Sequence, residues 1–293
     1  MVLGLVAAGA LMALLGWLAM WSGEPRYKGR TLTHWLAVYH KAQLNSPGER
    51  EAAAAIRSMG TNALPYLVAR LTYRTPAWRL RMVSLVEHLP GPADDWLITL
   101  ILGDEDHIAA ADAGFSLLGP QAAPAVPQLI RLLEHKETWD MGIVGLQDIG
   151  AGGIPELTAA LTNRANSPRV RAGLVQVLGS VGTNSTVVPT LVACLADDPH
   201  VAAQAVFALG RLHLEPEVTV PALLNAAQNN ANVRHQAIWA LGEFNTNALT
   251  AVPFLTNCLA DPDLGIRIVT TNALEAIAPE VLGPNAVAAE KQE

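Results

Sequence analysis

The chain has 293 residues, of which 51% are hydrophobic and 5% aromatic, and it carries a formal net charge of −7. The charge is uneven: residues 22–81 hold ten Lys or Arg against three acids, whereas residues 82–293 hold nine against 23. A net charge of −14 over the longer part argues against nucleic-acid binding, because phosphate contacts require a basic surface. Alanine and leucine dominate the composition, which favours helices.

The first element in chain order is an uncharged run at residues 2–21, VLGLVAAGALMALLGWLAMW. As a helix it would span about 30 Å, the thickness of a bilayer's hydrocarbon core. A cleavable signal peptide has a basic start and small residues before the cut, and this run lacks both. The sequence therefore predicts an uncleaved transmembrane anchor over residues 1–22.

A basic juxtamembrane segment follows at residues 23–46 and includes a predicted capping helix at 31–44. Arg26, Lys28 and Arg30 lie within the distance over which positive residues resist translocation, so we expect a single-pass membrane protein whose remaining part is cytoplasmic. A misassigned start codon that removed a basic N-terminus would reverse this orientation. The same three cations are candidates for contact with anionic lipid head groups, and the alternative is that they only set the topology.

One tetrapeptide returns along the rest of the chain in steps of 28 to 34 residues: LPYL at 64, DDWL at 94, VPQL at 126, IPEL at 154, VPTL at 188, VPAL at 220 and VPFL at 252. Six of the seven have proline second, and proline is tolerated in the first turn of a helix. The Thr-Asn pair before several of them offers side-chain oxygens that can cap the new helix. The tetrapeptide therefore predicts the start of the second helix in a repeated unit.

The first helix of the unit is amphipathic, as the spacing of Val170, Leu174 and Leu178 shows, and it is predicted to end at glycine: Gly60, Gly119, Gly150 and Gly182 in four units. One such pair cannot cover its own apolar face, so successive pairs must stack. We therefore expect an all-α solenoid of about seven helix pairs at 47–278. Its last helix, 264–278, is expected to cap the stack, with a disordered tail at 279–293.

The repeat resembles the HEAT family, in the short variety of bacterial HEAT-like proteins and phycobilisome lyases. The V-P-x-L starts carry the resemblance, together with Val170-Arg171, Val233-Arg234, Ala208 to Gly210, Ala240 to Gly242 and the acidic loops. It implies a right-handed superhelix of the HEAT or armadillo type, and it implies little about function. It also implies that a recurring arginine (Arg79, Arg171, Arg234, Arg267) meets a loop aspartate (Asp197, Asp198, Asp261, Asp263).

Catalytic and metal-binding signatures are not found: the sequence has no H-E-x-x-H, no G-x-S-x-G, no phosphate loop and no paired-Cys zinc motif. The glycines of Gly150 to Gly153 are predicted to form a turn, and the eight histidines are scattered. Cys194 and Cys258 hold equivalent positions two units apart, too far for a disulfide, and are expected to be buried. We therefore expect no catalytic residue, cofactor or metal ion. Asp112 lies inside an apolar run and is expected to face solvent; the alternative is a lone acid on a cleft.

An aromatic irregularity supplies the candidate partner-binding residues. One first-helix position is polar in three units, as Ser84, Gln176 and Asn272, but is Phe207 and Trp239 in two adjacent ones. With Arg234 and His235 close by, these aromatics would form a partner-binding patch; alternatively, they fill a gap between repeats. Trp78 and Arg81 form a weaker candidate of the same kind.

Three functions remain open at this point. The leading hypothesis is a membrane-tethered, non-catalytic scaffold that binds a protein or peptide on its HEAT-repeat surface. An alternative is an enzyme similar to the bilin lyases, although no motif matches a catalytic residue. The third, a nucleic-acid-binding HEAT protein, is opposed by the negative charge of the repeats.

Overall fold

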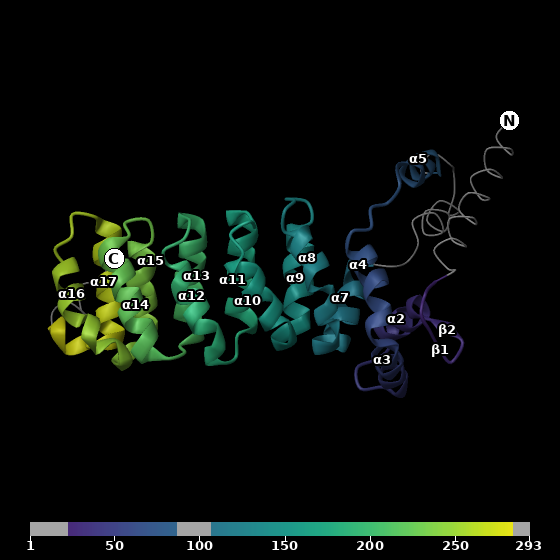
Figure 1. Ribbon diagram of the computed structural model, residues 1–293, viewed down its shortest axis with the longest axis horizontal. Coiled ribbons are helices and arrows are strands. Elements are labelled where there is room, and N and C mark those ends of the chain that lie inside the picture. The colour runs from purple at the N-terminus through teal and green to yellow at the C-terminus, as the bar shows by residue number, and fades with distance from the viewer. Residues whose placement is uncertain (1–22, 87–106, 284–293) are drawn as a thin grey trace. The chain divides into compact units, whose positions relative to one another are not determined.

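A computed structural model of the chain describes residues 23–86 and 107–283, and the chain divides between Gln128 and Leu129 into two compact units (Figure 1). Apart from one small hairpin, the regular structure described is helical. No helix within these residues is both long and apolar enough to cross a bilayer. The predicted anchor at 2–21, the DDWL tetrapeptide at 94 and the end of the tail lie outside the described residues.

The first unit begins with a hairpin that the sequence analysis did not predict. Strand β1 (Arg26–Tyr27) pairs antiparallel with β2 (Arg30–Thr31). The two residues between them, Lys28 and Gly29, both have positive φ (48° and 76°), as a two-residue type I′ turn requires. The basic segment at residues 23–46 therefore begins with a tight hairpin.

The predicted capping helix is confirmed as α2 (Leu32–Lys41), which is shorter than expected. It starts where the Thr31 side chain accepts a hydrogen bond from the His34 N–H, and its Trp35 indole donates to the Tyr27 carbonyl at 3.2 Å. These two contacts fix the hairpin to the helix that follows it.

The other elements of the first unit are α3 (Pro47–Met59), α4 (Leu64–Leu71), α5 (Ala77–Val86) and α7 (His107–Leu118), while α8 (Val126–Leu132) crosses the boundary between the units. Helices α2, α3, α4 and α7 pack on one another. Their fully buried side chains include Leu36, Ile56, Leu67 and Phe115, which form the core of this unit.

The second unit is a series of helix pairs: α9 (Trp139–Ile149) with α10 (Ile154–Thr162), α11 (Pro168–Val181) with α12 (Val188–Cys194), α13 (Pro199–Leu212) with α14 (Pro216–Asn229), and α15 (Arg234–Glu243) with α16 (Val252–Cys258), followed by α17 (Leu264–Ile277). The first helices pack in order, α9 on α11, α11 on α13, α13 on α15 and α15 on α17. Figure 1 shows these pairs side by side. The predicted stacking of successive pairs is confirmed in this unit.

A seam of small residues lets the first helices approach closely. A Cβ placed on Gly179 would lie 2.7 Å from the Cβ of Ala208, and one on Gly210 would lie 2.9 Å from that of Ala240. Gly242 faces Ala273 in the same way. These contacts explain the Ala-Leu-Gly motif. Its alanine packs against the first helix of the preceding pair, and its glycine leaves room for the first helix of the next pair.

The prediction that the proline-containing tetrapeptide marks a helix start is confirmed for five helices. These are α4, α8, α10, α12 and α16, which begin at Leu64, Val126, Ile154, Val188 and Val252. It is wrong at VPAL, because α14 begins at Pro216 and contains Pro221. There the Thr219 N–H donates to the Glu215 carbonyl at 2.8 Å, so the α-helical ladder is already running before Pro221. The expected Thr-Asn cap is not formed at α4, α12 or α16; Asn184 instead caps the 3-10 turn Ser185–Val187 that precedes α12, where it accepts from the Thr186 N–H.

Three further expectations need correction. Gly60, Gly119 and Gly150 end helices with positive φ, but Gly182 has φ −69°. As a cap, the last helix was expected to be polar at Thr270, Thr271, Asn272 and Glu275, but Thr270 is fully buried. The tail does not lose its structure at 279, since Pro279–Val281 forms a 3-10 turn.

Candidate interaction site

Phe207 and Trp239 hold equivalent positions on the neighbouring helices α13 and α15, and their rings stack. The ring centroids are 5.2 Å apart and the planes are tilted by 16°. Phe207 is 48% exposed, whereas Trp239 is only partly exposed. The predicted aromatic pair is therefore a contiguous surface whose outer member is Phe207.

Trp239 also has a packing role. A Cβ added to Gly210 would lie 3.0 Å from Cζ3 of Trp239, so the indole covers the glycine of the preceding helix. The gap-filling interpretation thus describes Trp239, while nearly half of Phe207 stays open to solvent. The two aromatics are not interchangeable targets for mutation.

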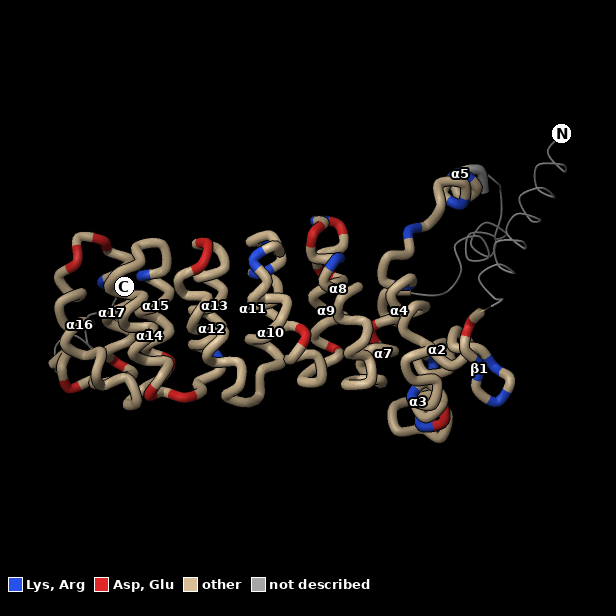
Figure 2. Tube along the Cα trace, in the orientation of Figure 1, with Lys and Arg blue, Asp and Glu red and all other residues tan. Residues whose placement is uncertain are grey.

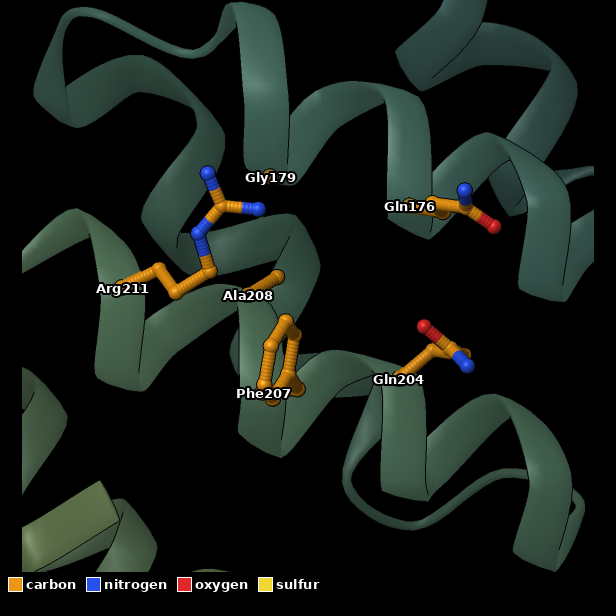
Figure 3. A pocket seen from close by; sticks show the side chains of 6 residues that line it. All are labelled: Gln176, Gly179, Gln204, Phe207, Ala208 and Arg211. Atoms are coloured by element: carbon orange, nitrogen blue, oxygen red, sulfur yellow. The ribbon is translucent and has the colours of Figure 1, made fainter. Parts of the chain in front are cut away.

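A hollow of about 270 Å³ adjoins the Phe207 ring, and its lining comes from α11 and α13 (Figure 3). The six lining residues are Gln176, Gly179, Gln204, Phe207, Ala208 and Arg211. Figure 3 shows the carboxamides of Gln176 and Gln204 facing each other near one end and Arg211 at the other, with Phe207 between them. We call these six residues the Phe207 hollow.

Arg211 gives the Phe207 hollow its charge. The side chain is exposed, and its guanidinium carbon lies 5.8 Å from the centroid of the Phe207 ring, a cation–π distance. Among the residues that the structure describes, the only contact of this guanidinium is the one with the Phe207 ring. Figure 2 shows the acids of the second unit gathered mainly in the loops that join helices, and the Phe207 hollow contains none.

Sequence reasoning missed Arg211 and Gln204, although a signal was available. Gln204 precedes Phe207 by three residues and Arg211 follows it by four, so all three share one face of α13. Gln176, noted only as an exposed equivalent of Phe207, lies across the hollow on α11. The identity of the facing helix could not be read from the sequence of α13 alone.

Arg234 was predicted to join the partner-binding patch, and the structure places its guanidinium elsewhere. Nη2 lies 2.8 Å from Asp261 and 3.6 Å from the Cys258 sulfur. The side chain is thus held by the loop after α16, as the repeated arginine of the resemblance implies. His235 is exposed but is not part of the Phe207 hollow.

The arginine–aspartate pairing is confirmed most fully at Arg171. Its Nε and Nη2 reach the two carboxylate oxygens of Asp197 at 3.1 and 2.6 Å, and its Nη1 donates to the Asn166 carbonyl at 2.5 Å. Arg171 is 6% exposed, and Arg164 adds a second cation to the same carboxylate. Burial works to raise the pKa of Asp197, but hydrogen bonds from Arg171 and the Asp198 N–H outweigh it and leave the pKa lowered.

The other two arginines depart from the pattern. Arg267 donates to the Asp261 and Pro262 carbonyls, and Arg79 donates to the Tyr73 hydroxyl at 2.9 Å. Asp198 and Asp263 do not pair with the recurring arginines; their side chains cap α13 and α17. The resemblance thus gave the right partner for two of four positions.

Cys194 and Cys258 are free and buried, as predicted. Burial raises the pKa of the Cys194 thiol to about 11, with the nearby Asp197 acting in the same direction. A thiol in this environment is neutral at physiological pH and packs as a small apolar group.

The weaker candidates lie in the first unit. Trp78 is 43% exposed on α5, with the Arg79 guanidinium 5.5 Å from its ring, and Arg81 is exposed on the same helix. Asp112 differs from its expected solvent-facing position: it is half-buried, and its Oδ1 is buried without a hydrogen bond from any described residue.

The candidate lipid contacts are the hairpin cations. Arg26, Lys28 and Arg30 are all exposed. Lys28 Nζ also pairs with Glu51 at 2.9 Å, which raises the pKa of Lys28, and Arg30 Nη1 lies 2.7 Å from His34 Nε2. Lys28 and Arg30 therefore already have polar neighbours within the unit.

No group of three metal-ligating side chains occurs within residues 23–86 and 107–283. Gly150–Gly153 forms a 3-10 turn that leads into α10, as the sequence predicted.

Part of this architecture matches a known protein family. Residues 188–278, which contain α12 to α17 together with Phe207, Arg211 and Trp239, match the family described as HEAT repeats. No curated protein matches the chain. The matched helices and their stacked pairs support a HEAT-repeat protein, a class whose members commonly mediate protein interactions.

Proposed function

We propose that this protein is a membrane-tethered, non-catalytic scaffold that binds a protein or peptide partner on the face of its second unit formed by α11, α13 and α15. The observation that carries the proposal is Phe207, a large apolar side chain that is 48% exposed beside a hollow and backed by Trp239. Exposed aromatics in a concave site are typical of residues that dominate binding energy. The absence of catalytic sequence motifs supports the non-catalytic part of the proposal.

The membrane tether in this proposal rests on the sequence of residues 2–21, twenty uncharged positions that end four residues before the basic hairpin. We expect the full chain to stay in the membrane fraction after carbonate extraction. A chain lacking residues 2–21 should appear in the soluble fraction. Retention of the truncated chain in the membrane would contradict the tether.

The partner-binding part is tested by crosslinking the full-length protein in its native membrane and recovering the bound proteins. The informative variant is Phe207→Gln, because glutamine occupies the equivalent position, Gln176, on α11. Its matched control is Val144→Gln, since Val144 is 37% exposed at the equivalent position of α9. Neither change opens a core cavity, and circular dichroism should show both variants folded.

We expect wild type and Val144→Gln to recover the same partner and Phe207→Gln to lose it. Equal recovery by all three proteins would show that Phe207 is not part of the binding surface. Recovery of no specific partner by wild type would contradict the scaffold proposal itself.

A further inference from the structure

We infer that the Phe207 hollow binds an extended peptide in which a proline or aromatic residue is followed two positions later by an aspartate or glutamate. The inference rests on the proposed function and specifies its partner. It follows from the charge, the exposed ring and the spacing of the groups that surround the hollow.

The charge of the hollow favours a carboxylate. Arg211 is its single cation, and the other five lining residues carry no charge. An arginine fork forms paired, charge-assisted hydrogen bonds with a carboxylate, and these are stronger than neutral ones. The surrounding chain is acidic: residues 129–293 hold nine Lys or Arg against 16 Asp or Glu. A single carboxylate suits this setting better than a polyanion, which the remaining acids would repel.

The ring of Phe207 favours a flat apolar group. Trp239 stacks against it, so the ring is held in place before any ligand arrives and loses little conformational freedom on binding. Proline and aromatic side chains pack well against the exposed part of such a ring, and a proline-containing segment that is already extended loses little entropy on binding. The carboxamides of Gln176 and Gln204 offer both donors and acceptors to the peptide backbone nearby.

The spacing follows from the distance between the two anchoring groups. The Arg211 guanidinium carbon lies 5.8 Å from the Phe207 ring centroid. In an extended peptide, side chains two residues apart share a face and are about 6.6 Å apart along the chain. Adjacent side chains point to opposite faces, so they cannot reach both groups at once. The two-residue spacing is therefore the one that fits.

The test uses fluorescence anisotropy with the full-length protein in detergent micelles and labelled synthetic decapeptides as probes. The peptides share Gly-Ser flanks and carry a central Pro-Ala-Glu or Trp-Ala-Glu. Matched peptides replace Glu with Gln, or move it next to the anchor as Pro-Glu-Ala or Trp-Glu-Ala. The protein variants are Arg211→Gln and, as control, Arg169→Gln. Arg169 is also exposed and also lies over an aromatic ring, 4.9 Å from the centroid of Trp139.

We expect at least one two-residue-spaced Glu peptide to bind wild type about tenfold more tightly than its Gln and shifted counterparts, as one good charged contact would give. Arg211→Gln should remove that advantage, and Arg169→Gln should leave it intact. Equal binding of the Glu and Gln peptides, or an unchanged preference in Arg211→Gln, would overturn the inference.

The outcome also separates this inference from the proposed function. If none of the peptides binds but Phe207→Gln still loses its membrane partner, the peptide specificity is wrong and the scaffold stands. If the peptides bind as expected but no partner is lost in the membrane, the hollow is a peptide site without the proposed role.

Discussion

The Arg171–Asp197 pair is the most deeply buried charge pair described in the second unit, with both side chains at 7% exposure or less. Such a pair is costly to form and costlier to break, because removing one partner leaves the other charge buried and uncompensated. Its carboxylate also receives Arg164 and the Asp198 N–H, so Asp197 satisfies several donors at once. The stability of this repeat therefore depends strongly on one side chain.

We predict that Asp197→Ala lowers the free energy of unfolding by about 3–5 kcal/mol, the range for breaking a buried pair. Urea unfolding followed by circular dichroism measures the change. The matched control is Asp261→Ala, whose partner Arg234 is 36% exposed and therefore less desolvated than Arg171, so the loss should be smaller. Equal losses in the two variants would show that burial does not control the strength of this pair.

The same pair predicts a dependence on pH. The pKa of Asp197 is lowered below its ordinary value of 3.8, so the unfolded chain takes up a proton at a higher pH than the folded chain does. The stabilisation that ionised Asp197 gives the folded state is fully present above about pH 4, and it is lost as the pH falls through the lowered pKa of Asp197. The urea midpoint should fall less steeply below pH 4 in Asp197→Ala than in wild type. Parallel curves would show that Asp197 does not contribute to acid sensitivity.

The raised pKa of Cys194, about 11, predicts low thiol reactivity. At pH 8 roughly one thiol in a thousand would be ionised, and the side chain is 5% exposed, so iodoacetamide should not modify the folded protein at this position. In urea the label should appear. Mass spectrometry of the labelled peptide measures both states, and rapid labelling without urea would show that this repeat opens readily.

At the scale of elements, the seam between first helices explains both the recurrence of the Ala-Leu-Gly motif and its end. On α17 the third position is Glu275 rather than glycine, and its side chain is exposed. A glutamate at this position would hold a further helix at a greater distance than glycine does. Among the residues that the structure describes, the close seam therefore ends at α17.

We predict that Gly242→Ala destabilises the protein by about 1–3 kcal/mol, the usual cost of overpacking. The new Cβ would lie 3.0 Å from the Cα of Ala273, and a backbone atom cannot move aside as a side chain can. The control is Gly48→Ala in α3, where the Cβ would meet only the Ser46 hydroxyl at 3.9 Å; alanine there should be neutral or mildly stabilising. Thermal unfolding compares the two, and a stabilising Gly242→Ala would show that the helices are not closely packed there.

The tetrapeptide predicted five of the described helix starts because proline excludes a preceding α-helix in most sequence contexts. It failed at Pro221 because proline removes only its own N–H, so a helix that starts earlier can accommodate it. The hairpin was missed because Lys-Gly is a weaker turn signal than Asn-Gly or Asp-Gly.

Phe207 was found because it breaks a polar pattern, whereas the Phe207 hollow was not. A hollow depends on which residues of α11 face those of α13, and this register is a tertiary property. Arg234 illustrates the same point. Arg234 lies near Trp239 in sequence, which suggested a shared surface, but the Arg234 guanidinium pairs with Asp261 in the loop after α16.

At the scale of the whole molecule, charge separates the two ends of the chain. The ten cations of residues 22–81 follow directly on the uncharged run at 2–21, whereas residues 82–293 carry the acidic excess. The hairpin presents Arg26, Lys28 and Arg30 within about ten residues of that run, inside the range over which cations set membrane orientation. The charge asymmetry therefore leads to a prediction about topology.

We predict that the part of the chain after residue 22 lies on the cytoplasmic side. The probe is Leu44→Cys, because Leu44 is 83% exposed, and the two native thiols are buried and should give little background. A membrane-impermeant maleimide should label this variant only after the cells are broken. Replacing Arg26, Lys28 and Arg30 together by glutamine should make part of the protein reactive in intact cells, because the charge bias is lost.

The matched control for this triple change is Arg50, Arg74 and Arg81 to glutamine. All three side chains are exposed, but they lie more than about 20 residues beyond the apolar run, where positive charge has little influence on orientation. This variant should stay unlabelled in intact cells, although it loses the same net charge. If both triple variants invert equally, total charge rather than the hairpin cations sets the topology. If wild type is already labelled in intact cells, the orientation is opposite to the one that its flanking charges predict.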